Sequence, residues 1–339
     1  DRRRQRRGLR LEHATLELAS RIDARRGARL AVGWHDRDRA HLEAAVLQGD
    51  YVWRGQALRL QVGRDTVRLG GVIDGAGHFD VFSQPPLAKR GVLNEQWIDD
   101  GIRAQWQPAG ADGLRALELG LWRGRSFPGG PAGPAVPSVH VHGGLGHLDA
   151  HLSVARLQPR SRGAAAQLAG ATGHVHGNLD CRASLQQRVC FDGAVDLLAG
   201  SVRWEPDDSA WSFSAAGLLR HERGALYAAA ADADFRSTVS GLWADARWRL
   251  RPDWQLAARA ERLSADNRLQ GVGTAALAGA AGLAAGGPVE RLTLAVQHEI
   301  GPSLALSFEA GQERHAAGRV SHIALRAVWR NPGLLGGRW

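Results

Sequence analysis

The closing stretch of the chain, 321–329, alternates strictly between apolar residues and polar or small ones. In an extended strand Ile323 and Leu325 would point to one side, and His322 and Arg326 to the other. A strand between lipid and a watery lumen has this pattern, because only one of its faces needs to be apolar. The same alternation recurs along the chain. The sequence therefore predicts an all-β fold, a single-chain antiparallel transmembrane β-barrel.

Composition agrees with a barrel. Hydrophobic residues make up 44% of the 339 residues, yet no run approaches the ~20 apolar residues that a membrane helix requires. We assign 1–8 to a basic N-terminal arm and 9–339 to the barrel. The arm is either a solvated terminus or a contact for an anionic partner. The chain contains no methionine, so we expect a processed mature protein or a fragment.

Short and long connections alternate along the chain. Short turns are expected at 206–209, 251–253 and 300–303. Long loops are expected at about 64–100, 124–137, 158–193 and 264–288. In outer-membrane barrels the short turns are periplasmic and the long loops extracellular.

Two further expectations concern individual strands. A separate strand is predicted over 227–231, and in 41–46 the residues Leu42, Ala44 and Val46 are expected to face outward. Many tryptophans lie near strand ends on the apolar side, as in the aromatic girdles of membrane proteins. They are Trp34, Trp106, Trp204, Trp211, Trp248, Trp254 and Trp329.

Several islands resemble a family of bacterial outer-membrane barrels, the zinc-regulated, TonB-dependent outer-membrane proteins, which are related to the phosphate-selective porins. The similarity is carried by 78–87, 93–102, 119–130, 191–206 and the closing segment. It implies an outer-membrane barrel of about 14 to 16 strands. The strand count from Leu9 comes out odd, so we expect that an opening strand is missing.

This chain departs from the family pattern in two respects. Family members often carry a His-x-His pair, but here only His78 stands at that place, after Ala76 and Gly77. A TonB-dependent receptor also needs a folded plug inside a barrel of about 22 strands. This chain is too short to contain such a plug, so any transport is expected to be passive.

The face opposite the apolar one collects more arginines than carboxylates. An arginine-lined lumen lowers the barrier for anions, whereas cross-strand ion pairs would instead close a small lumen. Both readings stay open. The expected pore-lining residues are Arg29, Arg59, Arg103, Arg203, Arg247, Arg249, Arg259, Arg326, Glu43 and Glu118.

Three histidines fall on inward positions of adjacent strands. His140 and His142 are two residues apart on one face, and His151 follows on the next strand with Asp149 beside it. Such a group can share a metal ion, although lumenal histidines are more often polar filler. We treat them as weak metal candidates. No other cofactor is expected.

The two cysteines, Cys181 and Cys190, lie in one long polar loop. They would be free thiols in a reducing cytosol and one loop disulfide in an oxidising compartment. Their spacing is not a two- or four-residue metal chelate. We therefore expect the disulfide.

The chain lacks the G-x-S-x-G, Walker and C-x-x-C-H motifs, so no enzyme is expected. No aromatic platform interleaves with the arginines, which argues against nucleic acid. The favoured function is an outer-membrane porin-like channel for small solutes or ions, mildly anion-selective. It would lie in outer-membrane lipid, alone or as a homo-oligomer. The alternative is a plugged barrel that scaffolds a docking protein.

The first long loop is expected either to fold inward as a constriction or to form a surface cap or subunit contact. Its candidates for contact with solute are His78, Asp80, Lys89, Arg90, Glu95, Asp99 and Asp100.

Overall fold

The computed structural model describes residues 11, 13–34, 40–77, 80–110, 113–163, 181, 189–283 and 287–330. The predicted basic arm and His78 lie outside the described residues. Within the described part of the chain, no helix has the length and apolarity needed to cross a membrane.

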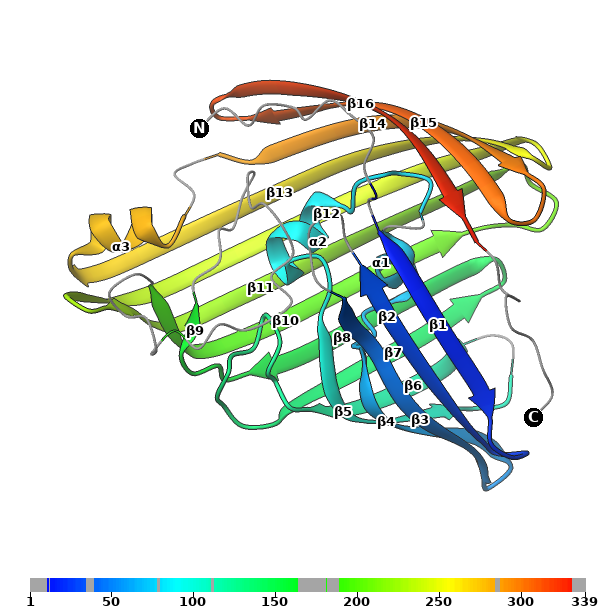
Figure 1. Ribbon diagram of the computed structural model, residues 1–339, viewed down its shortest axis with the longest axis horizontal. Coiled ribbons are helices and arrows are strands. Elements are labelled where there is room, and N and C mark those ends of the chain that lie inside the picture. The colour runs from blue at the N-terminus through cyan, green and yellow to red at the C-terminus, as the bar shows by residue number, and fades with distance from the viewer. Residues whose placement is uncertain are drawn as a thin grey trace.

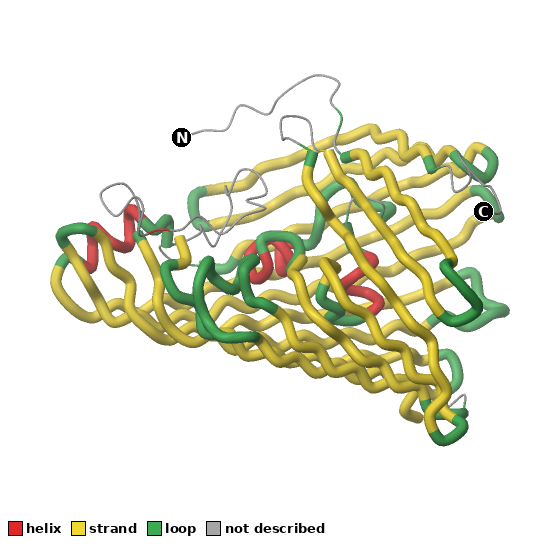
Figure 2. Tube along the Cα trace, turned by 60° about the horizontal axis from the view of Figure 1, so that its bottom comes forward, coloured by secondary structure: helices red, strands yellow, loops and turns green. Residues whose placement is uncertain are grey.

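One sixteen-stranded antiparallel sheet curls into a barrel (Figures 1 and 2). Neighbouring strands in the sheet follow the order of the chain, except that the short strand β9 lies outside this order and pairs only with β10. This architecture confirms the predicted fold class. The strands are β1 (Ala14–Arg21), β2 (Arg26–Trp34), β3 (His41–Trp53), β4 (Gln56–Thr66), β5 (Ile98–Gln107), β6 (Gly113–Trp122), β7 (Val136–Leu145), β8 (Leu148–Leu157), β9 (Arg162–Gly163), β10 (Cys190–Trp204), β11 (Trp211–Ala228), β12 (Ala231–Arg251), β13 (Trp254–Val272), β14 (Val289–Ile300), β15 (Leu304–His315) and β16 (Gly318–Trp329).

The first and last strands form the two edges of this sheet. Among the described residues, β1 pairs with β2 alone and β16 with β15 alone. With β9 set aside, the path from β1 to β16 contains fifteen strands that alternate in direction, so β1 and β16 run the same way. This agrees with the odd count from the sequence. These two edges therefore cannot pair antiparallel with each other.

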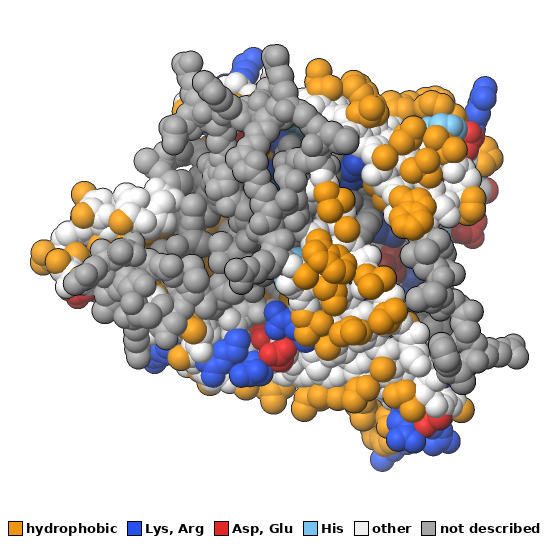
Figure 3. Space-filling view, viewed as in Figure 1, with side chains coloured by type: hydrophobic (Ala, Val, Ile, Leu, Met, Phe, Trp, Pro, Cys, Tyr) orange, Lys and Arg blue, Asp and Glu red, His pale blue; other side chains and the backbone are white. Residues whose placement is uncertain are grey.

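The outer face of the barrel is apolar, as the alternation predicts. Ile323 and Leu325 of β16 are 74% and 78% exposed. Apolar side chains cover much of the visible wall in Figure 3. At the short-turn end Trp211 of β11 stacks on Trp248 of β12, with ring centroids 5.4 Å apart. This end thus carries the aromatic girdle expected at a bilayer interface.

The predicted outward face of β3 is wrong beyond its second residue. Ala31 pairs with Ala44 but Val32 pairs with Leu42, so Glu43 is an extra, bulged residue. A bulge shifts the alternation by one position. Ala44 and Val46, expected outside, are therefore buried against the interior.

Two other boundaries also differ from expectation. The predicted strand 227–231 is a tight turn, because β11 ends at Ala228 and β12 begins at Ala231. The stretch 264–288, expected as a loop, begins as strand, since β13 continues to Val272. Helix α3 (Thr274–Ala280) follows. The connections expected at 124–137 and 158–193 lie between β6 and β7 and between β8 and β10.

The segment 67–97 between β4 and β5 enters the barrel, and we call it the lumen loop (Figure 2). It contains α1 (Gly71–Gly75) and α2 (Leu87–Leu93). Helix α2 packs on the inner face of β11, β12 and β13, and α1 on β10 and β11. Apolar side chains fill this contact, among them Ile73, Leu87, Val92, Leu93, Val239 and Trp243.

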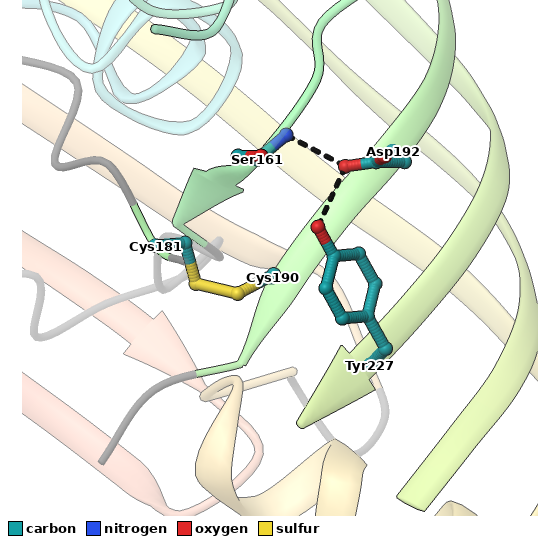
Figure 4. The surroundings of a disulfide bond; sticks show 5 residues. All are labelled: Ser161, Cys181, Cys190, Asp192 and Tyr227. Atoms are coloured by element: carbon teal, nitrogen blue, oxygen red, sulfur yellow. Dashed lines mark hydrogen bonds between the residues drawn. A yellow bond between two sulfur atoms is a disulfide. The ribbon is translucent and has the colours of Figure 1, made fainter. Parts of the chain in front are cut away.

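Cys181 and Cys190 form a disulfide at the end of the barrel that carries the long loops (Figures 1 and 4). Beside it, the Asp192 carboxylate accepts hydrogen bonds from the Ser161 backbone N–H at 2.6 Å and the Tyr227 hydroxyl at 2.9 Å. These bonds tie the start of β10 to the preceding loop and to β11.

Candidate functional site

The lumen loop is held to the barrel wall by charged side chains. Arg259 Nη2 donates to Asp80 Oδ2 at 2.6 Å, and Arg247 Nη2 to Asp80 Oδ1 at 2.8 Å. Burial alone would raise the pKa of Asp80, but the two guanidinium groups outweigh it and hold the pKa below its ordinary value. On the other side of the loop tip, the Ser83 N–H donates to Glu309 Oε2 at 2.7 Å.

Helix α2 has its own anchors. Arg291 donates to Gln84 Oε1 at 2.6 Å and to the Pro85 carbonyl at 2.8 Å, just before the helix. Arg220 donates to the Gly91 carbonyl at 3.0 Å near its end. These bonds satisfy carbonyl groups that the barrel interior would otherwise leave unpaired.

Lys89 joins the two helices of the loop. Its Nζ donates to the carbonyls of Ile73 at 2.9 Å and Ala76 at 2.6 Å, and the side chain is buried. Burial lowers the pKa of Lys89 to about 8, against the opposing pull of Asp74 and other carboxylates.

A cavity of about 880 Å³ lies between the lumen loop and the short-turn end of the barrel. Its walls come from β8, β10, β11, β12 and the neighbouring turns, and α1 and the loop tip form its floor. Among its lining residues, arginines outnumber carboxylates. The charged ones are Arg115, Arg203, Arg247, Arg249 and Arg330, with Asp80, Asp149, Glu205 and Asp207.

Only some of the arginines predicted to line the pore reach this cavity. Arg203, Arg247 and Arg249 line it. Arg249 is exposed and forms no ion pair with any described residue, whereas Arg203 lies 4.0 Å from Glu205. These two are the cavity's least neutralised cationic groups.

The remaining predicted arginines face inward but are engaged. Asp65 pairs with Arg29 at 2.5 Å and with Arg103 at 2.7 Å. Asp50 pairs with Arg59 at 2.6 Å. Much of the lumen wall is therefore a network of cross-strand ion pairs. This is the alternative that the sequence analysis left open beside an arginine-lined lumen.

The other inward candidates also have structural roles. Arg326 donates to the Asp80 carbonyl. Glu118 is buried and lies 4.0 Å from Arg103. Glu43, on the bulge, accepts a hydrogen bond from Thr15 at 3.1 Å.

Two of the expected solute contacts of the lumen loop, Lys89 and Asp99, are fully buried side chains. Lys89 and Asp99 are 3% and 0% exposed, and Asp80 is buried in its ion pairs. The Asp99 carboxylate instead accepts a hydrogen bond from the Arg125 backbone N–H at 3.0 Å, and this bond holds the connection between β6 and β7 in place. The Lys89 and Asp99 side chains are therefore closed to solute, whereas Asp80 lines the cavity with its carboxylate already paired to Arg247 and Arg259.

Three further candidates lie at the ends of this loop. Asp100 pairs with Arg64 at 3.3 Å and with Arg123 at 3.2 Å. Arg90 and Glu95 are partly buried at the end of α2. None of the three lines the cavity.

The histidine candidates come together as the sequence predicts. His142 and His151 are directly paired across β7 and β8, and their rings stack 4.2 Å apart. His142 Nε2 lies 2.6 Å and His151 Nε2 2.9 Å from the two Asp149 oxygens. His140 lies behind them, its Nε2 3.0 Å from His151 Nδ1.

Arg115 is a functional candidate that the sequence reasoning missed. It lies at a bulge of β6 and donates to Asp149 Oδ1 at 2.9 Å. A regular alternation would have indicated its face, but the bulge disturbs that pattern. The buried Arg162–Glu222 pair, 2.5 Å apart, was also missed, because Arg162 belongs to the short strand β9, in a stretch that the sequence analysis treated as a loop.

No protein-family model matches the chain, and no curated protein matches it. Solved outer-membrane barrels do. A loop L8 deletion mutant of OmpT, an outer membrane protein of Vibrio cholerae, has a TM-score of 0.55 and 11% identity, over 94% of this chain and 89% of that one. OmpF of Salmonella typhi, in complex with daunomycin, has a TM-score of 0.51 and 7% identity, over 88% and 82%. OprB of Pseudomonas putida has a TM-score of 0.51 and 10% identity, over 89% and 82%.

At these identities the likeness establishes the fold. The chain has the barrel fold of these porin-like outer-membrane proteins. The zinc-regulated and TonB-dependent parts of the family resemblance find no support in these neighbours.

Proposed function

We propose that this protein is a porin-like channel through which small solutes or ions diffuse passively across the outer membrane. The observation that carries the proposal is the arginine-lined cavity at the short-turn end, bounded by an inward-folded loop. A charged, water-accessible lumen beneath a fixed constriction selects solutes by size and charge.

We propose a mild preference for anions. More arginines than carboxylates line the cavity. One of the carboxylates, Asp80, is already neutralised by Arg259, which does not itself line the cavity. Arg203 and Arg249 are left as the groups most available to an anion. The preference is expected to be small, because Asp149, Glu205 and Asp207 stand in the same cavity.

Single-channel recording in a planar bilayer under a potassium chloride gradient tests this proposal. Detergent-folded protein should give stable conductance steps and a reversal potential on the anion-selective side. A clear cation preference would reject the selectivity, and folded, inserted protein that stays silent would reject the channel.

The alternative is a barrel with a plugged lumen that scaffolds a partner protein. It is favoured by the apolar contact between α2 and the walls of β11 to β13, which fills part of the interior. In that case the partner would dock on the long-loop end. Silent barrels that still insert would support this reading. Neither reading assigns an enzymatic activity or a nucleic-acid partner, and self-association remains an expectation.

A further inference from the structure

We propose that His142, Asp149 and His151 form a binding site for a divalent transition-metal ion of the zinc, nickel and copper class. The two imidazoles come from a directly paired position of β7 and β8. Asp149 precedes His151 by two residues, so it shares the same inner face. One ligand atom from each of the three residues lies within 4.8 Å of the others.

The donor set selects the class of metal. Two neutral imidazole nitrogens with one carboxylate suit borderline ions such as Zn²⁺, whereas Mg²⁺ and Ca²⁺ prefer oxygen ligands alone. Both Nε2 atoms already point at the Asp149 carboxylate, at 2.6 and 2.9 Å. A bound ion would replace the protons that these short contacts now share.

Surrounding residues hold the rings in place. His140 Nε2 lies 3.0 Å from His151 Nδ1, which is the outer contact that orients a metal-ligating histidine. Gly70 and Gly71, at the start of α1, allow the lumen loop to pass close to His151. A Cβ at Gly70 would lie 2.8 Å from the His151 Cβ.

The site is accessible from the cavity. Asp149 lines the cavity beside Arg115 and Arg203, and its side chain is 31% exposed. His142 is 26% exposed and His151 9%. An ion can therefore enter from the lumen and retain water at its open position, as three-ligand sites do.

Neighbouring arginines oppose a cation, and Arg115 does so by direct contact with a proposed ligand. Arg115 Nη1 lies 2.9 Å from Asp149 Oδ1 and competes for that oxygen. Metal binding thus requires the ion pair between Arg115 and Asp149 to break. This competition gives the proposal a test with a defined sign, because removing the Arg115 charge should tighten binding.

The experiment is zinc binding by equilibrium dialysis to the detergent-folded full chain, stripped with a chelator beforehand. Wild type should bind zinc, and His142→Ala and His151→Ala should each weaken binding by about tenfold or more. Arg115→Gln should strengthen it. His41→Ala is the matched control, because that ring lies 3.4 Å from Glu43 elsewhere on the lumen wall, and it should leave binding unchanged.

X-ray absorption at the zinc edge provides a second readout. It should show two imidazole nitrogens and oxygen ligands at about 2.0–2.2 Å. Wild-type binding no tighter than that of the His142→Ala, His151→Ala double variant would overturn the proposal. So would unchanged or weaker binding in folded Arg115→Gln. Neither result bears on conductance, so the proposed channel function would stand or fall separately.

Discussion

Arg259 and Asp80 form a buried ion pair with Nη2 2.6 Å from Oδ2, although 179 residues separate them in the chain. Arg259 also donates from Nε to Asp245 Oδ1 at 2.7 Å, within the barrel wall. The wall therefore presents a guanidinium that is already oriented when the lumen loop arrives. The position of the loop tip should depend on the Asp80 charge.

Replacing Asp80 with Asn should loosen the lumen loop. Removing one partner of a buried pair typically costs about 3–5 kcal/mol, and the lower end applies here because Arg259 keeps Asp245. Hydrogen exchange of amides in 67–97 should accelerate by about a hundredfold, at 1.4 kcal/mol for each tenfold. Asp50→Asn, at a partly exposed pair with Arg59, is the control and should leave the loop unchanged.

Mass-spectrometric exchange on the folded barrel resolves the two variants. If amides of the lumen loop exchanged at the wild-type rate in both variants, the Asp80–Arg259 pair would not be what anchors the loop. The apolar contacts of α2 would then be its main support.

Lys89 should make the docked loop sensitive to alkaline pH. Its pKa is about 8 when buried, against an ordinary value of 10.5. Between these values the docked loop binds fewer protons than the undocked one, so docking becomes more favourable as pH rises from about 8 to 10.5. The total gain is up to about 3 kcal/mol. A neutral amine still has the two N–H groups that the Ile73 and Ala76 carbonyls require.

Hydrogen exchange across this pH range, corrected for intrinsic rates, measures the effect. Protection of 71–93 should rise with pH in wild type. It should be independent of pH in Lys89→Met, which keeps an unbranched side chain only one heavy atom shorter and loses the titrating group. Equal slopes in the two proteins would show that Lys89 does not control docking.

The barrel itself was predictable because strand alternation is local. Ile323 and Leu325 face outward because side chains alternate along a strand and the lipid-facing side is apolar. A window of nine residues is enough to recognise that alternation. The β3 bulge at Glu43 was not predictable in this way. A bulge is set by the register of two strands, and only the pairing of Ala31 with Ala44 reveals it.

The same distinction applies to the site. His142 and His151 could be found because i, i+2 spacing and one short turn bring them together. The Asp80–Arg259 pair could not, since nothing local indicates which wall an inward loop will meet. The β11–β12 turn was missed because Ala229 and Ala230 lack the glycine, proline or asparagine that usually marks a turn.

Reversing the charge of Arg249 together with Arg203 should move the channel's selectivity towards cations. Both groups line the cavity. Arg249 forms no ion pair with a described residue and Arg203 lies 4.0 Å from Glu205, so Glu at each site changes the local charge without breaking a tight ion pair. The reversal potential under a salt gradient should shift towards the cation side. Arg268→Glu, on the long-loop extension of β13 and 76% exposed in its side chain, is the control and should leave it in place. An identical shift in the control would mean that surface charge, and not the cavity, sets selectivity.

Arginine on the apolar face of β16 should destabilise the barrel in a bilayer. Leu325 is 78% exposed on the strand's outer face, next to inward Arg326, so Leu325→Arg places a charge in hydrocarbon. The expected cost is about 2–4 kcal/mol near the bilayer midplane, falling to about 0–1 near an interface. Leu145→Arg is the matched control, because Leu145 is 70% exposed but ends β7 at a tight turn. Urea unfolding in lipid vesicles measures both, and only Leu325→Arg should lower the midpoint substantially. Equal costs would mean that the two positions lie at the same depth, which is incompatible with turns at one membrane surface and the middle of β16 in the hydrocarbon.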